Sequence, residues 1–345
     1  MTDSPSRRTT GDKDLDEQLE SLLDHVEATQ HRTILREIMV AAVGMARDVH
    51  DRLDLKIASA ALYEMWDAFN MFAPYKDVRK VTVFGSARTK PSDPAYQLAK
   101  TLARDLADRG WFVVTGAGPG IMLAANEGAG RERSFGVNIR LPFEQEANRY
   151  LVGDEKLVEM RYFFTRKLML MKESSAFVAL PGGFGTQDET LELLTLLQTG
   201  KSVPAPVVLL DVPGGTYWEH WEQFIIEELE EGGLIAADDR NLYTRVSTAE
   251  EACEEIAEFF SNYHSMRYVG DRLVIRMQRP VDDKLLERIN EACSDLVKVG
   301  SIRRTGPLAP EVEEDDRPEL PRLAFKYSLT HYGNWRPMLD LINEA

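Results

Sequence analysis

Cysteine and histidine are scarce in this sequence. Its 345 residues include two cysteines, Cys253 and Cys293, and neither has a second thiol near it in the chain. This excludes a disulfide framework and a Cys-rich zinc site, and it favours a reducing, cytoplasmic location. The six histidines form no H-E-x-x-H motif or other close pair, so no metal site is predicted.

Positive charge is also in short supply. The chain carries 41 Lys and Arg residues against 57 Asp and Glu residues, a formal net charge of -16. Non-specific binding of nucleic acid depends on cations that neutralise phosphates, so this balance argues against a nucleic-acid partner. A small anionic ligand is still compatible, because a local cluster of backbone N–H groups holds an anion against the overall field.

Long apolar runs are absent as well. No stretch approaches the roughly 18 apolar residues that a membrane span needs. The first residues, Met1 to Pro5, lack the apolar region of a secretory signal. We therefore expect a soluble, non-exported protein with no membrane partner.

The first part of the chain is predicted to be a disordered arm followed by a helical prefix. Residues 1–14 are polar and charged without periodicity, which is typical of disorder. Over residues 15–78 apolar side chains recur at the spacing of one helix face, for example at Leu62 and Met65. We expect these apolar stripes to pack on the core or on a second subunit.

Residues 79–262 alternate between short apolar runs rich in β-branched residues and helical segments. The predicted strands are Val81 to Phe84, Trp111 to Thr115, Phe135 to Ile139, Ala176 to Leu180 and Val207 to Leu210. The predicted helices include Tyr96 to Asp108, Tyr162 to Glu173 and Leu191 to Gln198. Nearly continuous apolar strands indicate a parallel sheet covered on both faces, so we predict an α/β fold with a doubly wound, Rossmann-like sheet. Ligands of such folds bind at the carboxyl ends of the strands.

Residues 268–345 are predicted to form a small α+β accessory module. Alternating residues indicate strands around Ile275 and Phe325, and helical stripes surround Ile289 and Met338. An acidic loop from Glu311 to Glu319 interrupts the pattern and is expected to be solvated.

Three glycine-containing turns each follow a predicted strand and precede a helix. They are Gly85-Ser86, Gly116 to Gly120, and Pro181 to Thr186. A helix N-terminus presents unpaired N–H groups, and glycines let an anion approach the backbone closely. Because all three turns follow parallel strands, they should open on the same edge of the sheet.

Two common nucleotide motifs are missing. The G-x-G-x-x-G motif requires glycine at position 121, where this sequence has Ile121. The next predicted strand ends near Asn138 and Arg140 without the acidic residue that binds ribose in that motif. No G-x-x-x-x-G-K-[ST] segment occurs either. A dinucleotide oxidoreductase and a P-loop NTPase are both disfavoured.

The third turn allows two interpretations. Thr186 and Glu189 have the spacing of a capping box, a helix-start device that needs no chemistry. However, one glycine suffices for a turn and this segment has Gly182, Gly183 and Gly185, which favours a binding site. Similarly, Arg166 and Lys167 on a predicted helix either point to solvent or belong to an ordered, partly buried cationic site.

The run from Tyr162 to Lys167, followed by Pro181 to Glu189, resembles the Lonely Guy family. These proteins are cytokinin-activating nucleoside monophosphate phosphoribohydrolases, often mislabelled as lysine decarboxylases. The turn at residues 115–122 also resembles the family's earlier glycine turn, with Ala117 where glycine is frequent. The resemblance covers about residues 80–260.

This resemblance implies hydrolysis of a nucleoside 5′-monophosphate to free base and ribose 5-phosphate, in cytokinin activation or in nucleotide salvage. Arg166 and Glu189 are the implied catalytic residues. The implied substrate- and phosphate-binding residues are Gly85, Ser86, Gly116, Gly118, Gly120, Lys167, Gly182, Gly183, Gly185 and Thr186. Glu189 would stabilise positive charge on the ribose, and its expected place in the first turn of a helix favours its ionised form. Arg166 would hold either the phosphate or the departing base.

No metal or organic cofactor is expected, pyridoxal phosphate included, because no Schiff-base lysine stands out. The resemblance also suggests a homodimer or a larger homo-oligomer with sites near the subunit contact. The alternative function is a nucleotide-binding sensor that retains the phosphate cradle without hydrolysis. The preferred base does not follow from the sequence.

Overall fold

Two compact units make up the chain in this computed structural model. The structure describes residues 8–141, 147–328, 330 and 332–345. The units are Met1–Trp66 and Asp67–Ala345, so the predicted core and accessory module fall within one unit. Residues 1–7 of the predicted arm lie outside the described residues.

The first unit is helical. It contains α1 (Lys13–His25), α2 (Arg32–Asp48) and most of α3 (Arg52–Phe72). Helix α1 begins after Asp12, whose carboxylate accepts hydrogen bonds from the first-turn N–H groups. Glu20 of α1 pairs with Arg32 at 2.7 Å and with Arg36 at 2.5 Å, which joins α1 to α2. Many apolar side chains of this unit are exposed: Leu22, Val26, Ile34, Leu35, Ile38, Leu53, Leu55, Leu62, Tyr63 and Trp66.

The second unit is built on a seven-stranded parallel sheet. Its strands are β1 (Lys80–Phe84), β2 (Phe112–Thr115), β3 (Ser134–Ile139), β4 (Leu157–Met160), β5 (Ala176–Ala179), β6 (Val207–Leu210) and β7 (Thr244–Val246). They lie in the order β4-β3-β2-β1-β5-β6-β7, and every neighbouring pair is parallel. The predicted doubly wound α/β fold is confirmed.

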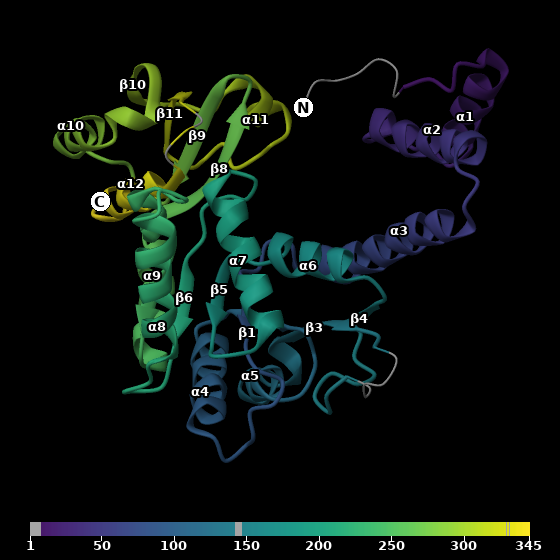
Figure 1. The fold of residues 1–345 in the computed structure, drawn as a ribbon. Helices are drawn as coiled ribbons and strands as arrows, with labels where there is room; N and C mark the ends of the chain where they lie inside the picture. Colours follow the sequence, from purple (N-terminus) through teal and green to yellow (C-terminus); the bar gives the residue numbers. More distant parts are fainter. Residues whose placement is uncertain (1–7, 142–146, 329, 331) are drawn as a thin grey trace. The chain divides into compact units, whose positions relative to one another are not determined.

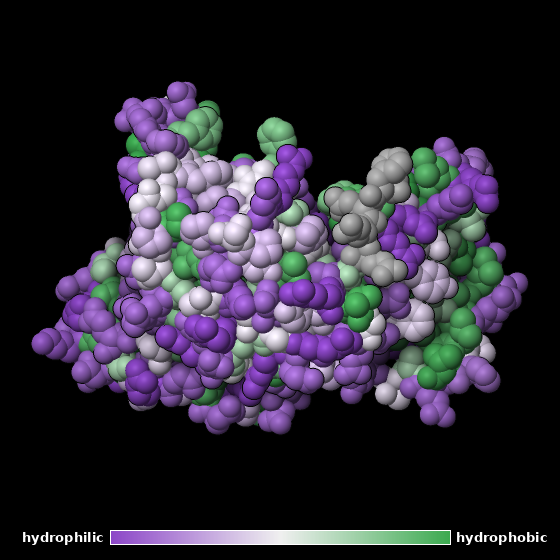
Figure 2. All heavy atoms as spheres, turned by 90° about the horizontal axis from the view of Figure 1, so that it is seen from below, coloured by the Kyte–Doolittle hydropathy of each residue, from purple (hydrophilic) through white to green (hydrophobic). Residues whose placement is uncertain are grey.

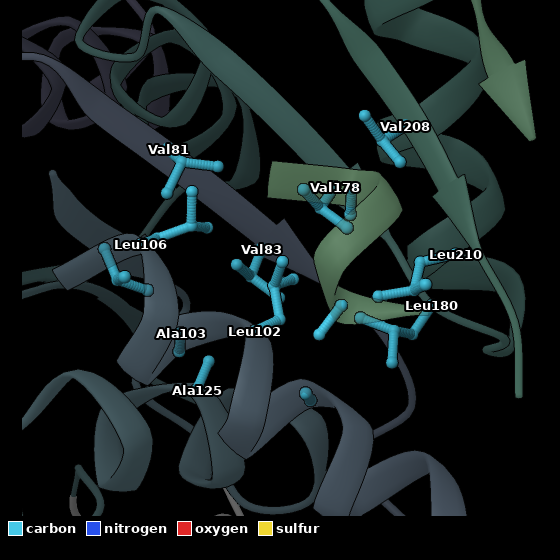
Figure 3. Close-up of a cluster of buried hydrophobic side chains, with 14 of the residues drawn as sticks. Val81, Val83, Leu102, Ala103, Leu106, Ala125, Val178, Leu180, Val208 and Leu210 are labelled. Carbon is cyan, nitrogen blue, oxygen red and sulfur yellow. The ribbon is translucent and has the colours of Figure 1, made fainter. Parts of the chain in front are cut away.

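Helices cover both faces of this sheet (Figure 1). Helices α4 (Pro94–Asp108), α5 (Ile121–Ala129) and α9 (Ala249–Phe259) pack on one face. Helices α6 (Phe163–Lys172) and α7 (Phe184–Gln198) cover the other, where Thr82 donates a hydrogen bond to the carbonyl of Leu170. Figure 3 shows side chains from β1, β5 and β6 converging on α4 and α5: Val81, Val83, Val178, Leu180, Val208, Leu210, Leu102, Ala103, Leu106 and Ala125. Complete burial of each larger side chain in this cluster stabilises the fold by about 1.5–3 kcal/mol.

The five predicted strands are present, but the two edge strands β4 and β7 were not predicted. An edge strand is covered less completely than a central one, so it lacks a continuous apolar run. In β4 the side chain of Glu159 is exposed, and β7 is the short segment Thr-Arg-Val. Helix α7 also begins at Phe184, earlier than the predicted Leu191, because the glycine turn leads directly into the helix.

A four-stranded antiparallel sheet follows the parallel one. It contains β8 (Tyr263–Val269), β9 (Arg272–Met277), β10 (Val297–Thr305) and β11 (Arg322–Tyr327) in the order β10-β11-β9-β8. Helices α10 (Asp283–Ala292) and α12 (Trp335–Asn343) pack on one face of this sheet. The first strand begins at Tyr263, before the predicted start, and Gly270 at φ +61° forms the tight turn to β9. The predicted small α+β element is confirmed.

The acidic loop is not simply solvated, and that expectation was wrong. Helix α11 (Ala309–Glu313) forms within it, and Glu311 is fully buried. Arg276 donates to Glu311 at 2.7 and 3.0 Å, and Arg322 pairs with it at 2.8 Å. The guanidinium groups of Arg276 on β9 and Arg322 on β11 therefore compensate the burial of this carboxylate.

Hydrophilic side chains dominate the face of the molecule seen in Figure 2, with hydrophobic ones in smaller groups between them. Within the residues that the structure describes, no helix combines the length and the apolar character needed to cross a membrane.

Candidate functional site

The three glycine turns meet at the point where the winding of the sheet reverses. From β1 the chain proceeds outward through β2, β3 and β4, and then returns to place β5 on the other side of β1. The Ser86 N–H donates to the carbonyl of Pro181 at 3.3 Å, and the Ile121 N–H donates to the carbonyl of Ser86 at 3.0 Å. These bonds connect the turns after β1, β2 and β5, so the prediction of a common edge is confirmed. Doubly wound proteins bind ligands at such a switch point.

A cavity of about 800 Å³ opens between these turns. Ten of the predicted site residues line it: Gly85, Ser86, Gly116, Gly118, Arg166, Gly182, Gly183, Gly185, Thr186 and Glu189. The structure thus brings together residues from four segments of the chain.

Two predicted site residues do not line this cavity. Gly120 has φ +67°, and a Cβ atom there would lie 2.2 Å from the carbonyl oxygen of Ser86, so this glycine lets two turns approach each other. Lys167 instead pairs with Asp188 at 2.8 Å and Glu192 at 2.7 Å. Both carboxylates belong to α7, so Lys167 joins α6 to α7.

Arg166 is an ordered, buried cation. Its Nε donates to the carbonyl of Val137 at 3.0 Å, and the residue is 9% exposed. The guanidinium lies against Gly116, where an added Cβ atom would come within 2.0 Å of Nη2. Of the two interpretations of this arginine, the structure supports the ordered site over the solvated one.

Glu189 faces Arg166, with 3.6 Å between Oε1 and Nη1, and only 13% of its side chain is exposed. Burial raises the pKa of the Glu189 carboxyl above its ordinary value, and the nearby Arg166 opposes this increase only in part. The expectation that a first-turn position favours ionisation was wrong. Helix α7 begins at Phe184, which places Glu189 in the second turn, and burial dominates.

The capping box is not formed. Gly183 is the N-cap of α7 and no side chain caps this helix, while Thr186 lies inside the first turn. An added Cβ atom at Gly183 or Gly185 would meet nothing within 4 Å. The N–H groups in the first turn of α7 are therefore next to open space, which an anion site requires.

Ala117 occupies the position in the second turn where the family often has glycine. Its φ is +56°, in the left-handed region that L side chains rarely adopt. The Ala117 N–H donates to Thr115 Oγ1 at 2.9 Å, and its carbonyl accepts from the Asn148 N–H at 2.8 Å. These two bonds hold the turn in this shape without glycine.

Sequence reasoning missed four polar residues of the cavity, Arg88, Asn138, Gln187 and Tyr217. The Tyr217 hydroxyl donates to the carbonyl of Gly182 at 2.7 Å and accepts from Gln187 Nε2 at 2.6 Å. Asn138 is the next-to-last residue of β3, and Arg88, Gln187 and Tyr217 follow β1, β5 and β6, so all four lie on the edge where the glycine turns open. A search of every strand's carboxyl end would have found them.

The described residues of the cavity combine three chemical features. A buried carboxyl and a guanidinium face each other, the start of a helix is free to bind an anion, and a tyrosine fixes the glycine turn. Among the residues whose placement is described, no group of three His, Cys, Asp or Glu side chains is arranged to hold a metal ion. Such a site suits a small molecule that carries an anionic group and develops positive charge nearby.

The fold defines a doubly wound α/β protein with a cavity at its switch point. The family model described as possible lysine decarboxylase matches residues 121–256. A cytokinin riboside 5'-monophosphate phosphoribohydrolase of Arabidopsis thaliana is 33% identical over 187 residues, covering 52% of this chain and 83% of the relative. An Oryza sativa subsp. japonica protein with the same description is 32% identical over 191 residues, covering 54% and 75%. The chain belongs to the Lonely Guy family of phosphoribohydrolases.

Solved structures with a similar fold include a molybdenum cofactor binding protein from Rippkaea orientalis. It is 20% identical, covers 51% of this chain and 94% of its own, and gives a TM-score of 0.38. The molybdenum cofactor carrier protein of Chlamydomonas reinhardtii is 22% identical, covers 52% and 97%, and gives a TM-score of 0.37. At TM-scores this low the likeness carries no argument about function.

Proposed function

We propose that this protein hydrolyses the N-glycosidic bond of a nucleoside 5′-monophosphate, releasing the free base and ribose 5-phosphate. AMP and cytokinin riboside monophosphates are the proposed substrates. The observation that carries the proposal is the buried pair of Arg166 and Glu189 in a cavity framed by three glycine turns. The names of the plant relatives support the same reaction.

The 5′-phosphate is proposed to bind at the start of α7. Its oxygens would accept hydrogen bonds from the N–H groups of Gly183, Gly185 and Thr186, with Gly118 across the cavity. The lack of side chains at Gly183 and Gly185 leaves room for this approach.

The reaction breaks the bond between C1′ of the ribose and the base nitrogen, and the oxygen of water bonds to C1′. Positive charge develops on the ribose as the bond breaks, so the Glu189 carboxylate stabilises the transition state more than the ground state. Glu189 also accepts the proton that the attacking water loses, and solvent water delivers one proton to the departing base nitrogen, so that one water molecule is consumed and no net proton is released. Arg166 keeps Glu189 in place and contacts either the phosphate or the departing base.

The proposal is tested by incubating the full chain with AMP and separately with adenosine. Adenine and ribose 5-phosphate should appear in equal amounts from AMP, and adenosine should be a far poorer substrate because it lacks the phosphate. Equal kcat/KM values for the two compounds would contradict the phosphate site. A panel of nucleoside monophosphates, cytokinin riboside monophosphates included, then identifies the preferred base.

The alternative is a sensor that binds the nucleotide without hydrolysis. Phosphate binding alone does not require a carboxylate beside the arginine, so the presence of Glu189 favours the enzyme. Binding of AMP by calorimetry without any release of adenine would support the sensor instead.

We also propose that the protein is a homodimer that uses the surface of α6 and α7. Large apolar side chains are exposed there: Phe163, Phe164, Leu168, Phe184 and Leu191. Phe184 is 95% exposed and belongs to the glycine turn, so a partner that covers it would lie at the cavity. The solution mass of the wild type and of Leu168→Asp tests this contact. A monomeric wild type would contradict it.

A further inference from the structure

A second cavity, of about 670 Å³, lies at the opposite edge of the parallel sheet. Residues that precede β1, β5 and β6 line it, together with β8, so it opens at the amino ends of the strands. The switch-point site is at the carboxyl ends. The two cavities are therefore separate.

Cations gather in this cavity although the chain as a whole is strongly acidic, at -16. Its lining includes Lys76, Arg79, Lys80, Lys172 and Lys201. Glu173 is the only carboxylate among the described lining residues, and it already pairs with Lys172. The lining is thus net positive in a protein whose overall charge is negative, and a positive cavity attracts a small anion.

Arg79 and Lys80 are the two cations of this cavity that are not exposed, and Arg79 has the fewer hydrogen bonds. Its guanidinium lies 3.6 Å from the centre of the Phe260 ring, and within the described part of the chain no side chain or carbonyl accepts a hydrogen bond from it. Burial lowers the pKa of Arg79, although the group remains charged. Buried or half-buried guanidinium groups elsewhere in this chain contact carboxylates, as Arg276 and Arg336 do. The guanidinium of Arg79 has five N–H donors and is held against the Phe260 ring. Two of these donors can bind two oxygens of one phosphate group at the same time.

Lys80 is a second built-in donor. It is 2% exposed, and its Nζ donates to the carbonyls of Tyr75 at 2.7 Å and Val78 at 3.1 Å. These bonds fix the ammonium group at the cavity and use two of its three N–H donors. The hydroxyl groups of Ser175 and Ser202 also belong to the lining and can donate to an anion.

We propose that this second cavity binds a phosphate-bearing small molecule, with Arg79 and Lys80 as the fixed donors and Lys76 and Lys201 as flexible ones. Phosphate is favoured over a carboxylate because four cations surround one space, and none of them pairs with a carboxylate of the described residues: Lys76, Arg79, Lys80 and Lys201. The proposal does not depend on glycosidic hydrolysis, since it concerns a separate cavity and its test measures binding.

Inorganic pyrophosphate is the probe, titrated into the full chain by isothermal calorimetry. The wild type should bind it, and Arg79→Gln should raise the Kd of one binding event at least ten-fold. Arg133→Gln is the matched control, because Arg133 also lies over an aromatic ring, that of Phe112, but outside this cavity. The control should bind like the wild type.

A second variant guards against loss of folding in Arg79→Gln. Lys76 and Lys201 are exposed, so Lys76→Gln with Lys201→Gln should preserve the fold and weaken the same binding event. Arg166 lines the switch-point cavity and not the second one, so Arg166→Gln should weaken only pyrophosphate binding at the switch point. Binding of pyrophosphate in the second cavity should be unchanged in this variant. The proposal is overturned if the wild type binds no pyrophosphate, or if only Arg166→Gln reduces binding.

Discussion

The guanidinium of Arg166 occupies the space that a side chain at Gly116 would fill. An added Cβ atom at position 116 would lie 2.0 Å from Nη2 and 3.2 Å from Cζ of Arg166. Gly116→Ala should therefore displace the guanidinium and disturb its pairing with Glu189. Because misplacement of a catalytic group by an ångström is costly, we expect kcat/KM for AMP to fall by about ten-fold or more.

Gly44→Ala is the matched control for that substitution. Gly44 lies in α2 and an added Cβ atom there meets nothing within 4 Å. Alanine is the better helix former by about 1 kcal/mol, so this variant should be at least as stable as the wild type and equally active. If Gly116→Ala were as active as Gly44→Ala, the position of Arg166 would not matter for turnover.

Glu189 should set the acid limb of the pH profile. Its burial raises the pKa of the carboxyl, so the catalytic carboxylate is lost at a higher pH than for an ordinary glutamate. We expect kcat/KM for AMP to fall on acidification with a midpoint above 4.5, the ordinary value for Glu. Glu189→Gln should lower kcat by about 10²-fold and remove this limb.

Asp188→Asn is the control for the charge change. Asp188 lies next to Glu189 in α7, but its side chain is 59% exposed and pairs with Lys167 outside the cavity. It should retain wild-type kcat and keep an acid limb, shifted to lower pH, because the negative charge of Asp188 contributes to the raised pKa of Glu189. An acid limb that survives in Glu189→Gln would have to belong to another group.

Tyr217 should position the glycine turn. Tyr217→Phe removes the hydroxyl that donates to the carbonyl of Gly182 and accepts from Gln187. Loss of these two bonds should cost about 1–2 kcal/mol of stability and loosen the proposed phosphate cradle. We expect a several-fold higher KM for AMP and a smaller change in kcat, measured by steady-state kinetics.

Tyr75→Phe provides a hydroxyl deletion of the same kind. The Tyr75 ring packs on Phe112 and Phe135, while no hydrogen bond of its hydroxyl is found among the described residues. Its KM should be unchanged. An equal effect of both variants would indicate general destabilisation instead of a role for Tyr217 at the turn.

The central strands and glycine turns were predictable because local sequence patterns, namely apolar runs and repeated glycines, determine them. Val81 and Val178 belong to apolar runs that only a covered sheet accommodates, and three glycines after β5 exceed what a turn needs. The role of Lys167 was not predictable, since its partners Asp188 and Glu192 come from another helix. For the same reason the burial of Glu189, which controls its pKa, depends on packing that no local pattern specifies.

The buried carboxylate of Glu311 should be a major source of stability in the C-terminal sheet. Burial alone would raise its pKa, but the Leu308 N–H, Arg276 and Arg322 outweigh burial and lower it. Glu311→Gln leaves the buried guanidinium of Arg322 without its carboxylate and leaves Arg276 with Asp316 as its remaining partner. We expect a loss of about 3–5 kcal/mol in the free energy of unfolding at pH 7, measured by urea denaturation.

The pH dependence of that loss separates the charge from the shape of the side chain. A carboxyl whose pKa is lowered in the folded state stabilises the protein above its unfolded pKa, and this contribution is lost as the pH falls through the folded pKa. The difference between wild type and Glu311→Gln should therefore be largest near neutral pH and shrink on acidification below the ordinary Glu value of 4.5. Glu314→Gln is the control, because Glu314 pairs with Arg267 but is 59% exposed, and such pairs contribute at most about 1 kcal/mol. A difference for Glu311→Gln that stays constant with pH would show that packing, and not the buried charge, holds α11 on the sheet.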